Sequence, residues 1–429
     1  MAARARLSLP AAGALVAAAV VALGLLYEAS GRVLGTATPP FVMAWGPRLH
    51  PLAAVSLLAA IAGVALAPRL PGAAALRRPA AYAAAVYALA VGLGLALSLM
   101  RLGLDGPTHV FDLGPGGSFE AKNEYLPGLP ALEPGARFFL DRFAEMVPAL
   151  PVNVAGHPPG LMLVVHALGI TTATQLAALC VGVGSLAGPL AYATGRALLD
   201  EQRARVAGLL CALSPSLLLI GVTSADYLYA AAGMLAAWLL VTRPAPLGWA
   251  ALAVASLLNW ALLAVGAWAA VLTWRRAGPR PAAVLAVGCG AAVVALDGAL
   301  WLAFGYDAIG ALRATHEVYE NSLAAIRPYW FWVLGSPVAW ALMAGLPIAW
   351  WVLAAVARRE ATALALAVVI VVAAVLGFTK AETDRIWLYL VPLAALAAAS
   401  VLPARRLGWV AAALVAQAVA TQALFDTVW

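Results

Sequence analysis

Residues 79–100 have the sequence PAAYAAAVYALAVGLGLALSLM, which is 22 residues without one charged side chain. A helix that crosses the apolar part of a bilayer needs about 20 such residues. Arg77 and Arg78 directly precede this stretch, whereas a long segment with several acidic residues follows it. The stretch therefore predicts a transmembrane helix with a basic side and an acidic side.

The same pattern recurs along the 429-residue chain, in which 64% of the residues are hydrophobic and 10% are charged. A soluble domain carries about 25% charged residues, so we predict an all-α polytopic membrane protein. We expect one integral membrane domain over 1–429 with about 13 spans. Three lie in 1–100, and the remainder lie in 172–429. The predicted spans are 9–27, 51–68, 79–100, 172–196, 206–222, 226–242, 246–258, 259–274, 281–304, 331–356, 362–378, 386–402 and 407–425.

Three of these predicted spans differ from the others. The pair 246–258 and 259–274 is short, and we expect a re-entrant-like hairpin around Asn259. The first span follows Arg4 and Arg6 and resembles a signal peptide, but a dozen apolar segments come after it. We therefore interpret it as an uncleaved first span.

Arginine residues predict the orientation. Cytoplasmic connections of membrane proteins carry an excess of Lys and Arg. With the N-terminus in the cytoplasm, every predicted inner connection contains arginine. The residues are Arg69, Arg77, Arg78, Arg196, Arg203, Arg205, Arg243, Arg275, Arg276, Arg280, Arg358, Arg359, Arg405 and Arg406. This pattern accounts for the net charge of +7 without nucleic acid as a partner, and the composition suggests the plasma membrane of a bacterium.

The predicted outer connections are longer and of mixed charge. The largest is the acidic loop 101–171, and the second is 305–330. Within the first, His157-Pro158-Pro159-Gly160 precedes an apolar stretch, 161–170, that is about 15 Å long as a helix and too short to span. We expect it to be an interfacial helix whose first turn is opened by the two prolines.

Several acidic side chains of these outer segments are candidates for chemistry. Glu124, in Lys122-Asn123-Glu124-Tyr125, and Asp112 lie in the first loop, and Asp226 lies in a tight turn between two spans. A carboxylate at a membrane face can act as a general base toward a hydroxyl when a partner orients it. The alternatives are a solvated loop acid at Glu124 or Asp112 and a helix cap at Asp226.

Candidate cationic groups lie on the same side. Lys380 and Arg385 flank Glu382 and Asp384 in a short turn. Arginine suits bidentate recognition of phosphate, and lysine acts as a point charge. His157, before the interfacial helix, can donate a hydrogen bond to an anionic head group. The alternatives are a salt-bridged turn at 380–385 and a turn histidine at His157.

Four motifs in this order resemble the GT-C superfamily of integral membrane glycosyltransferases, in particular the protein O-mannosyltransferases and the lipid A aminoarabinose transferases. The chain also resembles actinobacterial membrane proteins of this kind. The matching motifs cover residues 100–245 and are Asn123-Glu124-Tyr125, His157-Pro158-Pro159-Gly160, Tyr192-Ala193-Thr194-Gly195-Arg196 and Ser224-Ala225-Asp226. Asn123 stands where the family commonly has an aspartate.

The resemblance implies an inverting transfer of a sugar from a polyprenyl-phosphate donor to an acceptor hydroxyl at the outer face. The acceptor would be a lipid, a glycan or a protein. Glu124 would be the base, Asp112 the second choice, and Asp226 a supporting residue. The resemblance implies that Arg385, Lys380, His157 and Lys122 contact the lipid phosphate.

Two matters stay open at this point. A lipid or lipid-linked sugar flippase is the main alternative, although secondary transporters usually place their polar groups near the midplane of the bilayer. The acidic residues could also bind Mg²⁺ or Mn²⁺, whose preferred ligands are carboxylate oxygens, but their spacing does not require a metal.

Overall fold

The computed structural model describes residues 8–242 and 245–428, so Arg4, Arg6 and Arg243 lie outside the described residues. Helices dominate this part of the chain. Its one sheet pairs two short strands, β1 (Ala44–Trp45) and β2 (Phe425–Asp426), in antiparallel register. The prediction of an all-α protein is confirmed.

Six stretches of the described chain are long and apolar enough to cross a membrane. Four of them are built on α1 (Leu9–Ala29), α3 (Pro79–Leu102), α13 (Pro279–Phe304) and α20 (Leu407–Leu424). The other two join α2 (Ala53–Leu66) to the 3₁₀ turn after it, and α7 (Ala173–Gly184) to α8 (Ala187–Leu198). Alanine and leucine, which favour helices, dominate these segments, and many leucines and valines stay exposed on the molecule. These features indicate a membrane-spanning protein.

The other predicted spans are shorter helices. They comprise α9 (Glu201–Ala212), α10 (Asp226–Thr242), α11 (Ala245–Leu258), α12 (Leu263–Ala277), α17 (Ala361–Leu376) and α19 (Val391–Ala399). Asn259 separates α11 from α12, and its side chain accepts a hydrogen bond from the Ala261 amide at 2.8 Å. A total of about 13 spans stays a prediction.

The predicted span 331–356 is not one continuous helix. It consists of α15 (Tyr329–Ala344) and α16 (Leu346–Ala357), which meet at an angle of 114°. Gly345 between them has φ +126°, a conformation that favours glycine. The backbone amide of Leu346 donates to the side chain of Gln417, so the break is satisfied within the protein.

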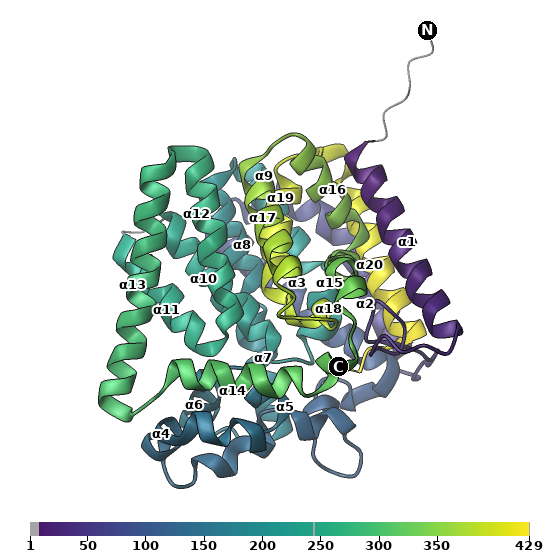
Figure 1. Ribbon diagram of the computed structural model, residues 1–429. Helices are drawn as coiled ribbons and strands as arrows, with labels where there is room; N and C mark the ends of the chain where they lie inside the picture. The colour runs from purple at the N-terminus through teal and green to yellow at the C-terminus, as the bar shows by residue number, and fades with distance from the viewer. Residues whose placement is uncertain (1–7, 243–244, 429) are drawn as a thin grey trace.

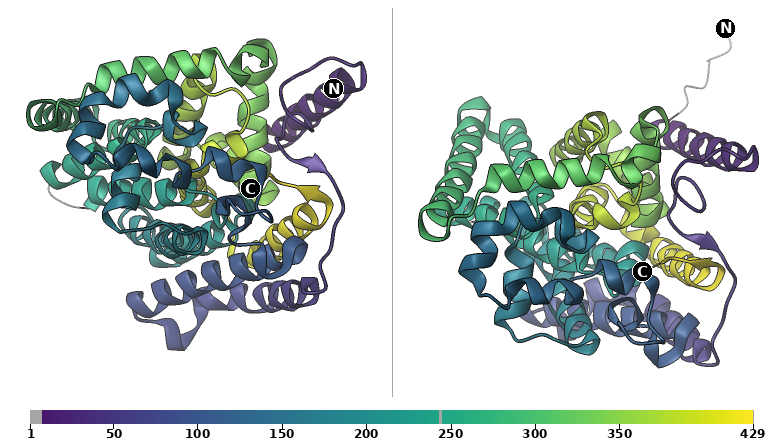
Figure 2. Two further views of the ribbon diagram at one scale, coloured as in Figure 1. Left: turned by 90° about the horizontal axis from the view of Figure 1, so that it is seen from below. Right: turned by 60° about the horizontal axis from the view of Figure 1, so that its bottom comes forward.

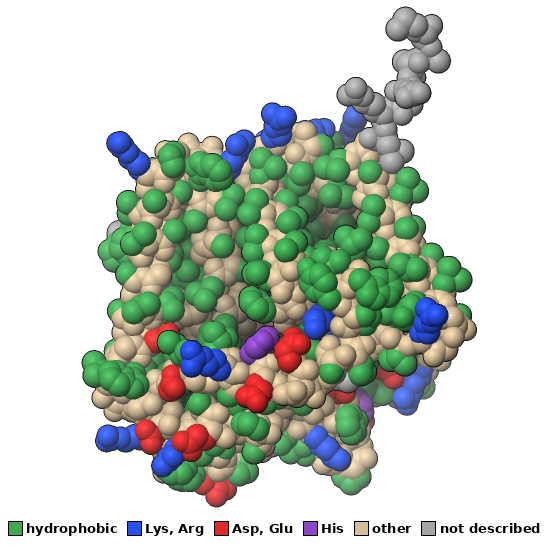
Figure 3. All heavy atoms as spheres, viewed as in Figure 1, with side chains coloured by type: hydrophobic (Ala, Val, Ile, Leu, Met, Phe, Trp, Pro, Cys, Tyr) green, Lys and Arg blue, Asp and Glu red, His purple; other side chains and the backbone are tan. Residues whose placement is uncertain are grey.

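Contacts between the connections sort them into two ends of the bundle (Figure 1). At one end, Arg205 donates to the backbone oxygens of Pro71 and Arg77, and Arg276 donates to that of Leu198. The charged side chains visible at this upper end of Figure 3 are all Lys or Arg, whereas both signs occur at the lower end. On this visible face the basic and mixed ends are therefore separate, and Asp200 and Glu201 at the arginine end are paired with Arg203, Arg196 and Arg205.

The two long connections cover the lower end. They contain α4 (Ala136–Met146), α5 (Val152–Ala155) and α6 (Gly160–Ala167) from the first, and α14 (Ala308–Glu320) from the second. Figure 2, seen from below, shows these short helices and α14 lying across the ends of the long helices. Thr315 of α14 donates to the Ala155 backbone oxygen at 2.7 Å, which ties the two connections together.

Candidate functional site

A buried cluster of charged side chains lies beneath this cover. Its members come from four distant parts of the chain, and we refer to them as the acid network. They are Glu124, Asn153, Asp226, Arg327, Glu382 and Arg385. Buried charges are tolerated when they are paired and hydrogen-bonded, and these side chains are joined in one continuous series of such contacts.

Arg385 is the centre of the acid network. It lies in α18 (Thr383–Ile386), and one terminal nitrogen donates to Asp226 at 2.9 Å. The other terminal nitrogen donates to Glu382 at 3.2 Å and to the side-chain oxygen of Asn153 at 3.4 Å. Burial alone would lower the pKa of Arg385, but Asp226, Glu382 and Glu124 outweigh burial and raise it. Its guanidinium thus stays charged and holds three segments together.

Asp226 is the first residue of α10 and does not cap that helix through its side chain. Its carboxylate accepts from Ser224 at 2.8 Å as well as from Arg385. The Asp226 backbone amide donates to the Ser224 hydroxyl at 3.1 Å, so serine shapes the turn. The second carboxylate oxygen of Asp226, Oδ1, is buried without a hydrogen-bond partner among the described residues.

A second guanidinium, that of Arg327, supports Glu382 from the connection before α15. It donates to the Glu382 carboxylate and, at 3.0 Å, to the Lys380 backbone oxygen. Burial would raise the pKa of Glu382, but Arg385 and Arg327 outweigh it and lower the pKa. Glu382 is therefore ionised and locks the 380–385 turn to its neighbours.

Glu124 is the exception in the acid network. Only 1% of it is exposed, and its Oε1 accepts from the Asn153 side chain at 2.8 Å. Its Oε2 is buried and has no hydrogen-bond partner within the described chain. Burial, aided by Asp226, raises the pKa of Glu124 to about 8 against the opposing effects of Arg385 and Asn153. When Glu124 carries a proton, the carboxylates of Asp226 and Glu382 balance the guanidiniums of Arg327 and Arg385. The acid network then has no net charge.

His157 lies beside Asn153, the hydrogen-bond partner of Glu124. Its Nδ1 lies 2.6 Å from the Asn153 backbone oxygen, which can only accept, so Nδ1 carries the proton. Burial lowers the pKa of His157, which favours the neutral ring. The hydroxyls of Tyr125 and Tyr229 hydrogen-bond to each other, and the Tyr125 hydroxyl also lies next to Nδ1 of His157. The first two motifs quoted above therefore meet in space, and Asn153 links them.

Other predicted site residues lie apart from the acid network. Asp112 accepts from the Gly114 amide at 2.9 Å and shapes its own turn. Lys122 is exposed, with its ammonium 5.9 Å from the centre of the Phe119 ring. Lys380 lies nearer, paired with Glu320 at 3.6 Å. In the parts of the chain that the structure describes, no group of three or more His, Cys, Asp or Glu side chains is arranged to hold a metal.

Three members of the acid network were not singled out in advance. They are Asn153, Arg327 and Glu382. Asn153 did leave a signal, because it is the one amide side chain in the apolar stretch 147–155. Arg327 and Glu382 were visible only as charges within outer connections.

Comparison with known protein families, with curated proteins and with solved structures found no match to this chain.

Proposed function

We propose that the chain is a membrane glycosyltransferase of the GT-C type, with Glu124 as the general base. One observation carries the proposal. Glu124 is a buried carboxyl group with one oxygen held by Asn153 and the other without a partner among the residues that the structure describes. An oriented carboxylate with one unused oxygen suits removal of a proton from a hydroxyl. The end of the bundle that holds it would face away from the cytoplasm.

The proposed reaction is a single displacement. The acceptor hydroxyl gives its proton to Oε2 of Glu124 while its oxygen bonds to the anomeric carbon of the donor sugar. The bond between that carbon and the phosphate oxygen breaks, and the electron pair leaves with the polyprenyl phosphate. Asn153 fixes the rotamer of Glu124 through Oε1. Asp226 and Arg385 support this arrangement by holding Asn153 and the neighbouring segments.

The family resemblance implies that several cationic side chains contact the donor phosphate, and the geometry supports different roles for them. Arg385 already bonds to Asp226, Glu382 and Asn153, and its side chain is 7% exposed. We therefore assign it to the support of the site rather than to the first contact with phosphate. Lys380, 15% exposed, is the cation that we propose for the donor phosphate. The neutral ring of His157 uses its Nδ1 proton on the Asn153 backbone oxygen, so we do not assign it to phosphate.

A flippase is the second candidate, because broken helices are typical of transporters. The chain just after α9, which ends at Ala212, lies beside the break between α15 and α16, and the Ser214 hydroxyl donates to the Ala344 backbone oxygen at 2.8 Å. Gln417 bonds to both sides of the same break, to the Leu346 amide and to the Leu342 oxygen. Since protein side chains satisfy these backbone groups, the break favours a structural role over a transport site.

Purified protein in proteoliposomes distinguishes the two candidates. We expect a labelled sugar to pass from a polyprenyl-phosphate donor into a glycosidic bond with an added acceptor. Movement of the intact labelled lipid between leaflets, without a glycosidic product, would support the flippase and contradict the proposed transferase. A panel of lipid, glycan and peptide acceptors tests the three proposed classes of acceptor.

The rate of transfer should depend on pH. Glu124 acts as a base only when ionised, and its pKa of about 8 leaves about one tenth of the molecules in that form at pH 7. We expect the rate to rise about tenfold per pH unit below 8 and to level off above it. Asn153→Leu removes a hydrogen bond that favours the carboxylate, so it should move the midpoint to higher pH. A flat profile between pH 6 and 9 would argue against Glu124.

A further inference from the structure

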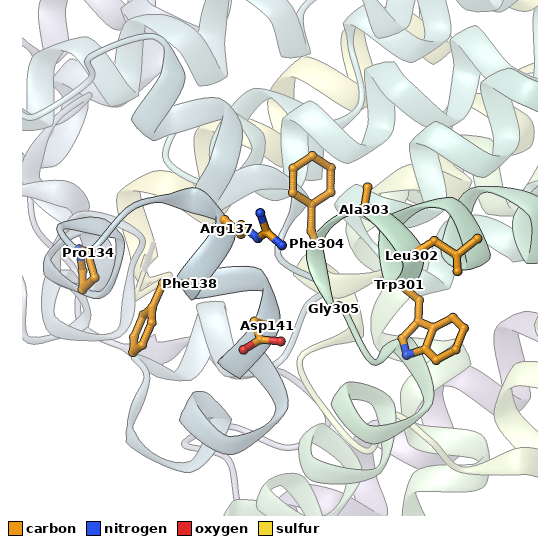
Figure 4. A pocket seen from close by; sticks show the side chains of 9 residues that line it. All are labelled: Pro134, Arg137, Phe138, Asp141, Trp301, Leu302, Ala303, Phe304 and Gly305. Carbon is orange, nitrogen blue, oxygen red and sulfur yellow. The ribbon is translucent and has the colours of Figure 1, made fainter.

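A hollow lies at the same end of the molecule as the acid network, between α4 and the last turn of α13 (Figure 4). Its volume is about 600 Å³. From α4 it is lined by Arg137, Phe138 and Asp141, and from the other side by 301–305. None of its lining residues belongs to the acid network.

The hollow opens where α13 leaves the apolar region of the bundle. Only 11% of the residues in the apolar stretch of α13 are buried within the protein, so most of this helix is free to face lipid. Trp301 is 62% exposed and Leu302 is 78% exposed in its last turn. Tryptophan is enriched at the boundary between lipid and water. A ligand in this hollow would therefore lie at the level of phospholipid head groups.

Two opposite charges line the hollow one helical turn apart. Arg137 and Asp141 are both exposed, and Figure 4 shows both side chains directed into the space between α4 and α13. Arg137 has no ion pair among the described side chains. Arg142, the next arginine of α4, is held instead by both oxygens of Glu145 at 2.8 and 2.9 Å. Arg137 is therefore the cation of α4 that is available to a ligand.

Gly305 brings the carboxylate of Asp141 close to the end of α13. A Cβ atom at this position would lie 2.2 Å from Asp141 Oδ1, and the φ of +77° also favours glycine. The carboxylate is thus set against the backbone beyond α13. The Asp141 carboxylate is also 3.7 Å from the Arg142 guanidinium. Its side chain stays 55% exposed, so it can bind a further cation.

We propose that this hollow binds the head group of one phospholipid with a primary ammonium group, of the phosphatidylethanolamine class. Arg137 donates to the phosphate, and Asp141 accepts from the ammonium. Residues four apart on a helix have Cβ atoms about 5–6 Å apart, which suits a phosphate and an ammonium joined by two carbons. The acyl chains lie along the exposed apolar face of α13. This proposal does not depend on the proposed transferase.

The chemistry of the two charges sets the specificity. A primary ammonium has three N–H donors for Asp141, whereas the trimethylated ammonium of phosphatidylcholine has none. Phosphatidylglycerol keeps the phosphate for Arg137 but has no cation for Asp141. We therefore expect selection of the ethanolamine lipid over both, by about tenfold, which corresponds to about 1.4 kcal/mol.

The test uses the full chain in nanodiscs with equal amounts of the three phospholipids, followed by native mass spectrometry of the lipids that stay bound. Arg137→Gln should reduce retention of all three lipids. Asp141→Asn should keep retention but abolish the preference for ethanolamine over choline. Ala303→Trp, which fills the hollow without a change of charge, should reduce retention of the ethanolamine lipid to the level of an unselected lipid.

A matched control lies on the same helix outside the hollow. Glu145→Gln removes a carboxylate as Asp141→Asn does, but Glu145 pairs with Arg142 and does not line the hollow, so this variant should leave the preference within twofold. Soluble glycerophosphoethanolamine should compete weakly, because it lacks the acyl chains. Equal retention of the three lipids by the wild-type chain, or an unchanged preference in Asp141→Asn, would overturn the proposal. Thermal unfolding of each variant identifies any loss of folded protein.

Discussion

Replacing Glu124 with glutamine should abolish sugar transfer while leaving the protein folded. The amide keeps the size of the side chain and can still bond to Asn153, but it cannot accept a proton. General base catalysis contributes about 10²-fold to 10⁴-fold to a rate, and we expect a loss of that size. Transfer is measured in proteoliposomes with a labelled polyprenyl-phosphate sugar.

The same variant should be more stable than the wild type at alkaline pH. The pKa of Glu124 is raised from 4.5 to about 8, so the folded state favours the protonated form. The wild type therefore loses stability relative to Glu124→Gln as the pH rises from about 4.5 to about 8. We expect the melting temperature of the variant to exceed that of the wild type by a few degrees at pH 8. This gain separates loss of a base from loss of the fold.

Glu133→Gln provides a matched control, because Glu133 is exposed in the same outer loop. Its transfer rate should stay within twofold of the wild type. Asp112→Asn tests the second-choice base and should also have little effect, since Asp112 only shapes its own turn. Full activity in Glu124→Gln, or loss of activity in Asp112→Asn, would contradict the assignment of Glu124.

The broad fold could be predicted because its signals are local. An uninterrupted apolar run predicts a span by its length, and arginine clusters sort the connections into two groups. The break between α15 and α16 does not show in hydropathy, because Gly345, Leu346 and Pro347 are all apolar. Glycine and proline are the residues that commonly end a helix, and at Gly345 the positive φ and the close approach of Leu414, about 70 residues later, favour glycine. Hydropathy alone therefore predicted one span where there are two helices.

Three residues of the acid network could be predicted from the sequence, but the hydrogen bonds and ion pairs that join them could not. Glu124, Asp226 and Arg385 were candidates because they are charged side chains in the predicted outer loop and turns, where a carboxylate can act as a base and a guanidinium can bind phosphate. Their pairing is a tertiary property, since Asp226 and Arg385 are 159 residues apart in the chain. Arg385 and Asn153 are 232 residues apart, and no local pattern joins them. The raised pKa of Glu124 follows from burial, which a loop sequence does not predict.

The second large effect is expected from removal of the central cation. Arg385→Gln leaves Asp226 without its ion pair while only 3% of that side chain is exposed. Removal of one partner from a buried pair costs about 3–5 kcal/mol, because the remaining charge stays desolvated. We expect a large fall in the melting temperature of the variant, measured in detergent or nanodiscs. Arg385→Lys should restore little, since one ammonium cannot reach Asp226, Glu382 and Asn153 together.

A second substitution distinguishes a lost ion pair from a general disturbance of α18. Asp226→Asn in the Arg385→Gln background removes the uncompensated carboxylate, so the double variant should be more stable than Arg385→Gln alone. The comparison stays informative even if the single variant fails to fold. Arg142→Gln, which removes an arginine from an exposed pair, should change stability by less than about 1 kcal/mol. A double variant no more stable than Arg385→Gln would show that the pair does not carry the stability of this end of the bundle.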